Sequence, residues 1–156
     1  MANVQAMCTS FKQELLNGSH AFGAQSANGT RTVTTKDTFK MALYLASASL
    51  GAGTTAYSAT GELAATGNYA AGGNAVTNAT APTTSGTTGF WTPSASVSWA
   101  NLTSSGSFDA VLLYNTASSG NLAVSVHTFG AQSITAGTFT LTMPTNDASN
   151  ALVRVA

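Results

Sequence analysis

Few residues of the types that commonly do chemistry occur in this sequence. Its 156 residues include two histidines, His20 and His127, and one cysteine, Cys8. A hydrolytic site needs a nucleophile, a general base and an orienting group that converge in space. Each histidine stands two residues before a Phe-Gly pair, near an expected strand end, which favours a hydrogen-bonded turn residue. Cys8 lies beside Met7 and Phe11, where a cysteine usually acts as a small buried hydrophobe.

The acidic residues and the glycines lead to the same expectation. The five acidic residues are spread along the chain, with no close pair suited to glycoside cleavage. No Cys or His spacing resembles a zinc site, and no Asp-rich loop resembles a calcium site. Residues 51–53 (Gly-Ala-Gly) lack the further glycine, the lysine and the helix of a phosphate-binding loop. We therefore predict no catalytic, cofactor-binding or metal-ligating residue and no enzymatic activity.

The charge pattern argues against two classes of partner. Five scattered Lys and Arg residues are balanced by five Asp and Glu residues, so the formal net charge is zero. A nucleic-acid groove needs clustered cations that displace counterions. The sequence has no run of about 18 apolar residues to span a bilayer, and its start lacks the features of a secretory signal. We expect neither a nucleic-acid partner nor a membrane partner.

Four small residue types dominate the composition. Ala, Gly, Ser and Thr supply 86 of the 156 residues, and 6% of the residues are charged. A free protein surface usually carries about 25–35% charged residues. Two interpretations stay open: a neutral surface solvated by hydroxyls and amides, or a surface covered by a partner in an assembly. The length suits a single domain over residues 1–156.

The N-terminal segment has the hydrophobic period of a helix. Its apolar residues recur with a spacing of three or four, and Asn17-Gly18 supplies a stop signal. These features predict one helix over residues 3–17. Ser10 and Gln13 offer a capping box for a shorter helix that starts later. The residues on the apolar face are Val4, Met7, Cys8, Phe11 and Leu15.

After this helix the period changes to two. Phe39, Met41, Leu43 and Leu45 alternate with other residues, which predicts a half-buried strand. Residues 46–75 are rich in Gly, Ala and Thr and predict a long loop or contact arm. Further strand-like segments follow at near-regular spacing, which predicts a mainly β, antiparallel sandwich or barrel. These segments are residues 75–80, 96–99, 108–114, 122–127, 138–143 and 151–155.

Four aromatic residues are candidates for an interface. Phe90 and Trp91 stand in a stretch otherwise made of Thr, Ser, Gly and Pro, and large aromatics in loops are often interface anchors. The alternative is that Trp91 folds back over a thin core. Tyr57 and Tyr69, in the 46–75 loop, have the same two interpretations. Trp99 alternates with Val97 and is expected in the core.

One heptapeptide occurs twice. Residues 20–26 (His-Ala-Phe-Gly-Ala-Gln-Ser) match residues 127–133 (His-Thr-Phe-Gly-Ala-Gln-Ser) at six of seven positions. A threonine-rich segment follows each copy, at residues 29–34 and 137–142. The similarity predicts two equivalent strand–turn–strand corners, paired across the sandwich.

Several segments, in their order along the chain, resemble small structural proteins of tailed bacteriophages. The segments are residues 8–16, 37–44, 55–62, 69–73 and 110–115, and the resemblance extends from about residue 8 to the C-terminus. It implies a sandwich of the jelly-roll type with one N-terminal α-helix. It also implies a capsid decoration, or cement, protein that binds the major capsid protein on the outer surface of the virion.

The same resemblance implies a homo-oligomer, a dimer or a trimer, and no cofactor. For such a role, glycine content and isolated aromatic residues favour the 46–75 loop and the Phe90-Trp91 loop as the contact regions. The role has no catalytic motif, so no site residue follows from the family. Two alternatives stay open: a tail or fibre component, and a glycan-binding sandwich that stacks sugars on Trp91 and on Tyr57 or Tyr69.

Overall fold

The structure is a computed structural model that describes residues 2–23 and 35–156. It is mainly β, with 37% strand and 6% helix. The elements in chain order are β1 (Ala6–Met7), α1 (Thr9–Leu16), β2 (Phe39–Leu45), β3 (Asn74–Ala75), β4 (Thr83–Ser85), β5 (Thr88–Trp91), β6 (Val97–Leu102), β7 (Phe108–Asn115), β8 (Ala123–Gln132), β9 (Gly137–Leu141) and β10 (Val153–Val155).

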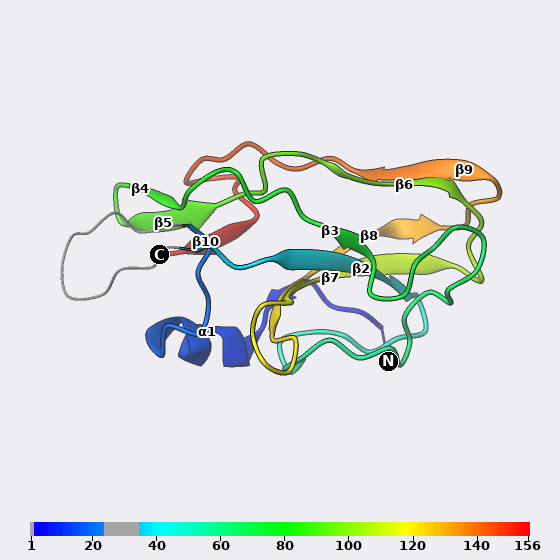
Figure 1. Cartoon of the computed structure of the whole chain (residues 1–156), viewed down its shortest axis with the longest axis horizontal. Coiled ribbons are helices and arrows are strands. Elements are labelled where there is room, and N and C mark those ends of the chain that lie inside the picture. Colours follow the sequence, from blue (N-terminus) through cyan, green and yellow to red (C-terminus); the bar gives the residue numbers. More distant parts are fainter. Residues whose placement is uncertain (1, 24–34) are drawn as a thin grey trace.

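The strands form three antiparallel sheets. The central sheet has the order β1-β8-β7-β2-β3, and two smaller sheets have the orders β10-β5-β4 and β6-β9. Figure 1 shows the two smaller sheets together in one layer above the central sheet, with α1 and several loops beneath it. The mainly β, antiparallel class with one N-terminal helix is therefore confirmed, and the layers are those of a β-sandwich. The jelly-roll connectivity stays a prediction.

The central sheet is covered on both faces. Met41 and Leu43 on one face of β2, and Ala42 and Tyr44 on the other, are all at most 1% exposed. The strand predicted over residues 38–45 is therefore confirmed as β2, whereas its predicted half-burial is wrong. Its physical reason is the extra layer: because α1 and the 46–75 loop cover the second face, both sets of alternating side chains are buried.

The helix is shorter than the predicted 3–17. It starts after Cys8, whose backbone is extended (φ −64°, ψ 138°) and whose side chain makes no cap. Ala6 pairs with Val126 in the central sheet, and the Cys8 amide donates to the Val124 carbonyl oxygen at 3.0 Å. Residues 6–7, which match the helical period, therefore pair as a strand with β8 and do not join the helix. The Ser10 capping box is wrong, since the Ser10 hydroxyl is buried without a partner.

The 46–75 loop lies along the central sheet and does not project as an arm. Backbone bonds hold it at Leu45 to Gly61 and at Leu63 to Leu43, each 2.9 Å long. Isolated bridges add Tyr44 with Glu62 and Ala56 with Leu122. Where the loop rejoins the sheet, a Cβ at Gly73 would collide with the Met41 backbone, so only glycine fits this close approach.

The strands predicted at residues 96–99, 108–114, 122–127, 138–143 and 151–155 correspond to β6 to β10. Residues 75–80 form a strand only at their start, in β3. The expected Phe90-Trp91 loop is wrong, because both residues belong to β5, which pairs with β4 and β10. Thr and Gly supply most of β4 and β5, and their partner β10 lies far along the chain. The local hydrophobic pattern therefore did not predict strands β4 and β5.

The two copies of the heptapeptide are not equivalent. Residues 127–130 lie inside strand β8, whereas residues 20–23 are in neither a strand nor a helix. The prediction of two equivalent strand–turn–strand corners is therefore wrong at the first copy, whereas the second copy leads from β8 through residues 133–136 into β9. Residues 24–26, and the threonine-rich segment at 29–34, lie outside the part of the chain that the structure describes.

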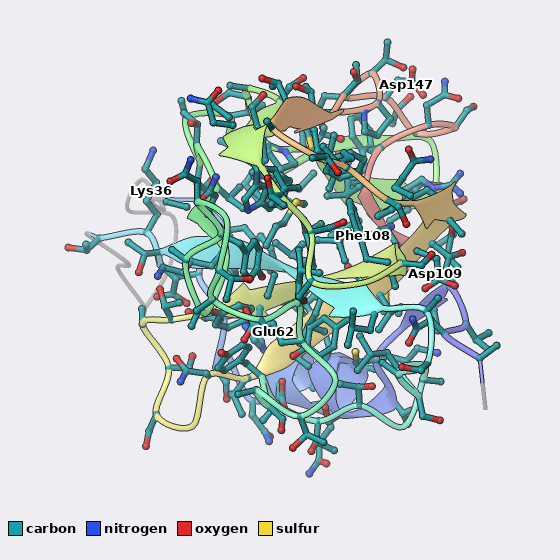
Figure 2. All side chains as sticks on the ribbon, turned by 90° about the vertical axis from the view of Figure 1, so that its right-hand side faces the viewer. Lys36, Glu62, Phe108, Asp109 and Asp147 are labelled. Atoms are coloured by element: carbon teal, nitrogen blue, oxygen red, sulfur yellow. The ribbon has the colours of Figure 1, made fainter. Side chains whose placement is uncertain are left out.

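Two groups of aromatic rings lie in the core. The Trp91 cluster comprises Phe11, His20, Phe22, Phe39 and Trp91, with ring centroids 4.6 Å apart for Phe22 and Phe39. The Phe139 cluster comprises Trp99, Phe108, Phe129 and Phe139. Phe108 is fully buried and lies in the interior between the layers (Figure 2).

Candidate functional site

The two tyrosines proposed for an interface bind a buried carboxyl group instead. Glu62 is 7% exposed. The Tyr57 hydroxyl donates to its Oε2 at 2.6 Å, and the Tyr69 hydroxyl donates to its Oε1 at 2.7 Å. The Gly72 amide also donates to Oε1, at 2.7 Å. Both carboxyl oxygens of Glu62 are therefore satisfied by the loop that carries it.

The remaining two tyrosines complete the surroundings of this group. The Tyr114 ring stacks on Tyr57 with centroids 4.7 Å apart, and its hydroxyl donates to the Gly72 carbonyl oxygen at 2.7 Å. The Tyr44 hydroxyl donates to the Ser58 carbonyl oxygen. All four tyrosines of the chain thus gather around Glu62, which lies on the side of the central sheet that faces α1 (Figure 2). We call Glu62 and these tyrosines the tyrosine cage.

Burial is the main electrostatic effect in the tyrosine cage. It raises the pKa of all four phenols, and the neighbouring Glu62 raises each pKa further. The pKa of Tyr114 rises to about 12. The phenols are therefore neutral hydrogen-bond donors at physiological pH. The Glu62 carboxyl group holds its own loop together, and the Tyr44 and Tyr114 hydroxyls join that loop to the central sheet, which is a structural role.

Phe90 and Trp91 form the wall of an open apolar pocket. They are 8% and 2% exposed, so neither side chain protrudes as an anchor. The pocket has a volume of about 500 Å³ and lies between the α1 end of the chain and strands β5 and β10. None of the described residues that line it is Lys, Arg, Asp or Glu. We call it the β5 pocket, with walls formed chiefly by Phe11, Phe22, Pro82, Phe90, Trp91 and Val153.

Hydrogen bonds fix the tryptophan in this wall. Trp91 Nε1 donates to Asn78 Oδ1 at 3.1 Å and to the Thr80 carbonyl oxygen at 3.0 Å. Its ring packs on Phe22 with centroids 4.8 Å apart. Such fixed side chains give the pocket a preformed shape, which lowers the entropy lost when a ligand binds. A shaped apolar pocket can receive an apolar side chain or loop.

A polar network supports one side of the β5 pocket. The side chain of His20 is 0% exposed, and its Nε2 donates to Glu14 Oε2 at 2.8 Å. Asn115 Nδ2 donates to His20 Nδ1 at 3.0 Å and to Asp37 Oδ2 at 2.6 Å. Asp37 and Ala21 are joined by two further bonds of 2.8 Å. His20 therefore occupies a structural position between two hydrogen-bond partners, Glu14 and Asn115.

The second histidine forms the nearest approach to a nucleophile and base. Ser125 Oγ lies 2.8 Å from His127 Nε2 on β8, and burial lowers the pKa of His127 to about 4. The structure gives this pair no carboxyl partner among the described residues, so a triad is not assembled. At Cys8, burial and then Glu14 raise the thiol pKa to about 11, which disfavours the thiolate.

The described residues contain no group of three or more His, Cys, Asp or Glu side chains that could hold a metal ion. Lys36, Asp109 and Asp147 lie at separate places on the outside of the molecule (Figure 2). In the described part of the chain, no helix has the length and apolarity needed to cross a membrane.

Comparisons with known proteins identify no relative. No family model, no curated protein and no solved structure matches the chain.

Sequence reasoning missed the role of Glu62. The signal was present, because Glu62 is the only charged residue between Lys40 and Asp109. A single carboxylic acid in a long stretch of small residues is costly to bury without donors. The whole tyrosine cage could not be deduced, since Tyr44 and Tyr114, which complete it, lie on the other elements β2 and β7.

Proposed function

We propose that this chain is a non-enzymatic structural protein of a phage virion. It decorates the outer surface of the capsid and binds subunits of the major capsid protein. The β5 pocket is the observation that carries this proposal. Its described lining is preformed, apolar and free of Lys, Arg, Asp and Glu, as expected of a surface that accepts a partner's apolar loop.

Two further observations support the assembly. The surface carries few charges, since 6% of the residues are charged, and so lacks the usual protection against association. Leu16 is 90% exposed and Val155 is 50% exposed. Val155 lies in the wall of the β5 pocket, and Leu16 is the last residue of α1. Docking at the pocket would remove Val155 from water.

A pocket-filling variant tests the proposal. At Gly89, a strand residue in the pocket wall, an added Cβ has no atom nearer than the Val155 carbonyl oxygen at 3.9 Å. Gly89→Leu should fill the pocket without disturbing the fold, and Gly89→Ala is the matched control. We expect Gly89→Leu to weaken binding to heads assembled from the major capsid protein of the same genome by at least about tenfold. Gly89→Ala should bind like the wild type.

Cosedimentation with heads and with tails measures both binding and location. Equal binding of the two variants to heads would remove the β5 pocket from the proposal. Binding to tails and not to heads would replace the capsid location with a tail or fibre location. The glycan alternative receives no support from exposed rings, because Trp91 is 2% exposed and Tyr69 is 3% exposed.

A further inference from the structure

Strands at the end of a sheet present unpaired backbone groups to other chains. Proteins block such edges with very short strands, charged side chains, proline or β-bulges. Four of the outer strands in the described part of the chain are short. Strands β1 and β3 have two residues each, and β4 and β10 have three each.

The two-stranded sheet has two different edges. Along β6 the register shifts between Trp99 and Leu102, and Asn101 has a positive φ of 52°. Asn74 Nδ2 also donates to the Ser98 carbonyl oxygen of β6 at 2.6 Å. The outer edge of β6 is therefore irregular and partly occupied.

The edge of β9 has none of these devices. Its five residues, Gly137–Leu141, alternate regularly between half-buried and exposed, and the alternation continues to Met143. Residues 137–143 contain no charged residue and no proline. Among the described residues, the backbone of β9 pairs with β6 alone. Phe139 is half-buried at this edge, where it packs on Phe129 with centroids 5.2 Å apart.

We propose that a second copy of this chain pairs, antiparallel, with the outer edge of β9. The two-stranded sheets of both copies then join into one sheet of four strands across a two-fold axis. When two identical edges pair, each residue lies near the same residue of the second chain. A charged residue on the edge would therefore be repelled by its counterpart in the second chain. None of the ten charged residues lies within 137–143, which makes this edge compatible with itself.

The alternation of β9 limits the register of this pair to those with the two-fold axis at a residue of the strand. Directly opposed residues in an antiparallel pair lie on the same face, and a shift by one residue exchanges the faces. With the axis at Thr140, the centre of residues 137–143, Phe139 lies opposite Leu141 of the second copy. Thr138 then lies opposite Thr142 of the second copy. Apolar side chains meet on the inner face, and threonines meet on the outer face.

The inference goes beyond the capsid proposal, because it requires only two copies of this chain. Light scattering on the purified protein should give twice the monomer mass of 15.6 kDa. Thr140→Cys should form an intermolecular disulfide on mild oxidation, since residue 140 faces itself across the axis. Thr84→Cys, on the exposed edge strand β4, is the matched control and should not cross-link above background. The native Cys8 is buried and 0% exposed.

A charge variant tests the same edge without cross-linking. Thr138, Thr140 and Thr142 are all exposed, so replacing all three with Lys should leave the fold intact. We expect dimerisation to weaken by at least about tenfold because like charges meet across the axis. Replacing Thr83, Thr84 and Ser85 of β4 with Lys is the control and should preserve the dimer. Mixing the triple-Lys variant with the corresponding triple-Glu variant should restore a dimer.

A monomeric or trimeric wild type, or a dimer that survives the triple-Lys substitution, would overturn the inference. Equal cross-linking at residues 84 and 140 would also overturn it. If the wild type is a monomer and the triple-Lys variant loses binding to heads, the β9 edge receives a capsid strand instead of a second copy. A dimer that does not bind heads would contradict the proposed function and leave the β9 interface standing.

Discussion

Two stretches of the chain, residues 20–23 and 127–130, share His, Phe and Gly in the same order but differ in structure. In the first, the backbone is irregular and the His20 side chain is fully enclosed by Glu14, Asn115 and aromatic rings. In the second, the backbone is part of β8 and His127 bonds to Ser125. In both, the phenylalanine joins an aromatic cluster. The shared residue types thus determine which interactions the side chains of the two stretches can make. The backbone conformation of each stretch is determined by contacts with residues far away in the sequence.

The largest expected difference between the two copies is at phenylalanine. Phe22 is 7% exposed and packs on Phe39 and Trp91, whereas Phe129 is half-buried. Phe22→Ala should lower the free energy of unfolding by about 3–4 kcal/mol, and Phe129→Ala by about 1–2 kcal/mol. Urea denaturation of the two variants measures both values. Equal losses would show that the two aromatic clusters contribute equally to the free energy of unfolding, which would contradict this prediction.

The second difference concerns histidine and pH. The pKa of His127 is lowered from 6.5 to about 4 in the folded protein, so the unfolded chain binds a proton first as the pH falls. Stability should therefore be unaffected by this group above pH 6.5 and should decline between pH 6.5 and 4. We expect a loss of about 2 kcal/mol, since partial exposure moderates the effect.

His127→Gln tests this expectation, because glutamine keeps a hydrogen-bonding group for Ser125 and does not titrate. Its unfolding free energy should lack the component that falls between pH 6.5 and 4. A wild type and a variant with parallel pH profiles would assign the acid sensitivity to other groups.

The smallest difference is at glycine. A Cβ on Gly23 would lie 2.8 Å from Cδ of Pro82, whereas a Cβ on Gly130 meets no atom within 4 Å. Gly23→Ala should cost about 1–2 kcal/mol, because the Pro82 ring cannot turn aside. Gly130→Ala should change stability by less than about 0.5 kcal/mol. Thermal unfolding of both variants measures these two changes in stability. If Gly23→Ala left the stability unchanged, the backbone at residues 20–23 would be able to move away from Pro82.

The period of two was sufficient to predict most of the long strands. Residues 108–114 and 122–127 pair as neighbours in β7 and β8, and their apolar runs are strong. The pattern was insufficient where a tertiary partner outweighed it. Residues 4–7 have a helical period, but the edge of β8 takes Ala6 and Met7 into a strand. Tertiary pairing commonly overrides local propensity in this way.

The candidate site was predicted only in part. The sequence singled out Phe90 and Trp91, and the structure places both in the β5 pocket, as its wall and not as protruding anchors. The pocket itself could not be predicted, because Phe11, Pro82 and Val153 reach it from distant parts of the chain. Tyr57 and Tyr69 were selected for their isolation in a loop of small residues. Their common partner is a carboxyl group on that same loop.

The tyrosine cage has an optical consequence. Because every tyrosine of the chain belongs to it, the near-ultraviolet tyrosine absorbance comes from one place in the molecule. A phenol whose pKa is raised in the folded state contributes stability below its unfolded pKa, and this contribution is lost as the pH rises through the folded value. For Tyr114 that window runs from about pH 10 to about pH 12. An alkaline titration followed at the phenolate band should therefore show the tyrosine cage ionising above the usual range of tyrosine.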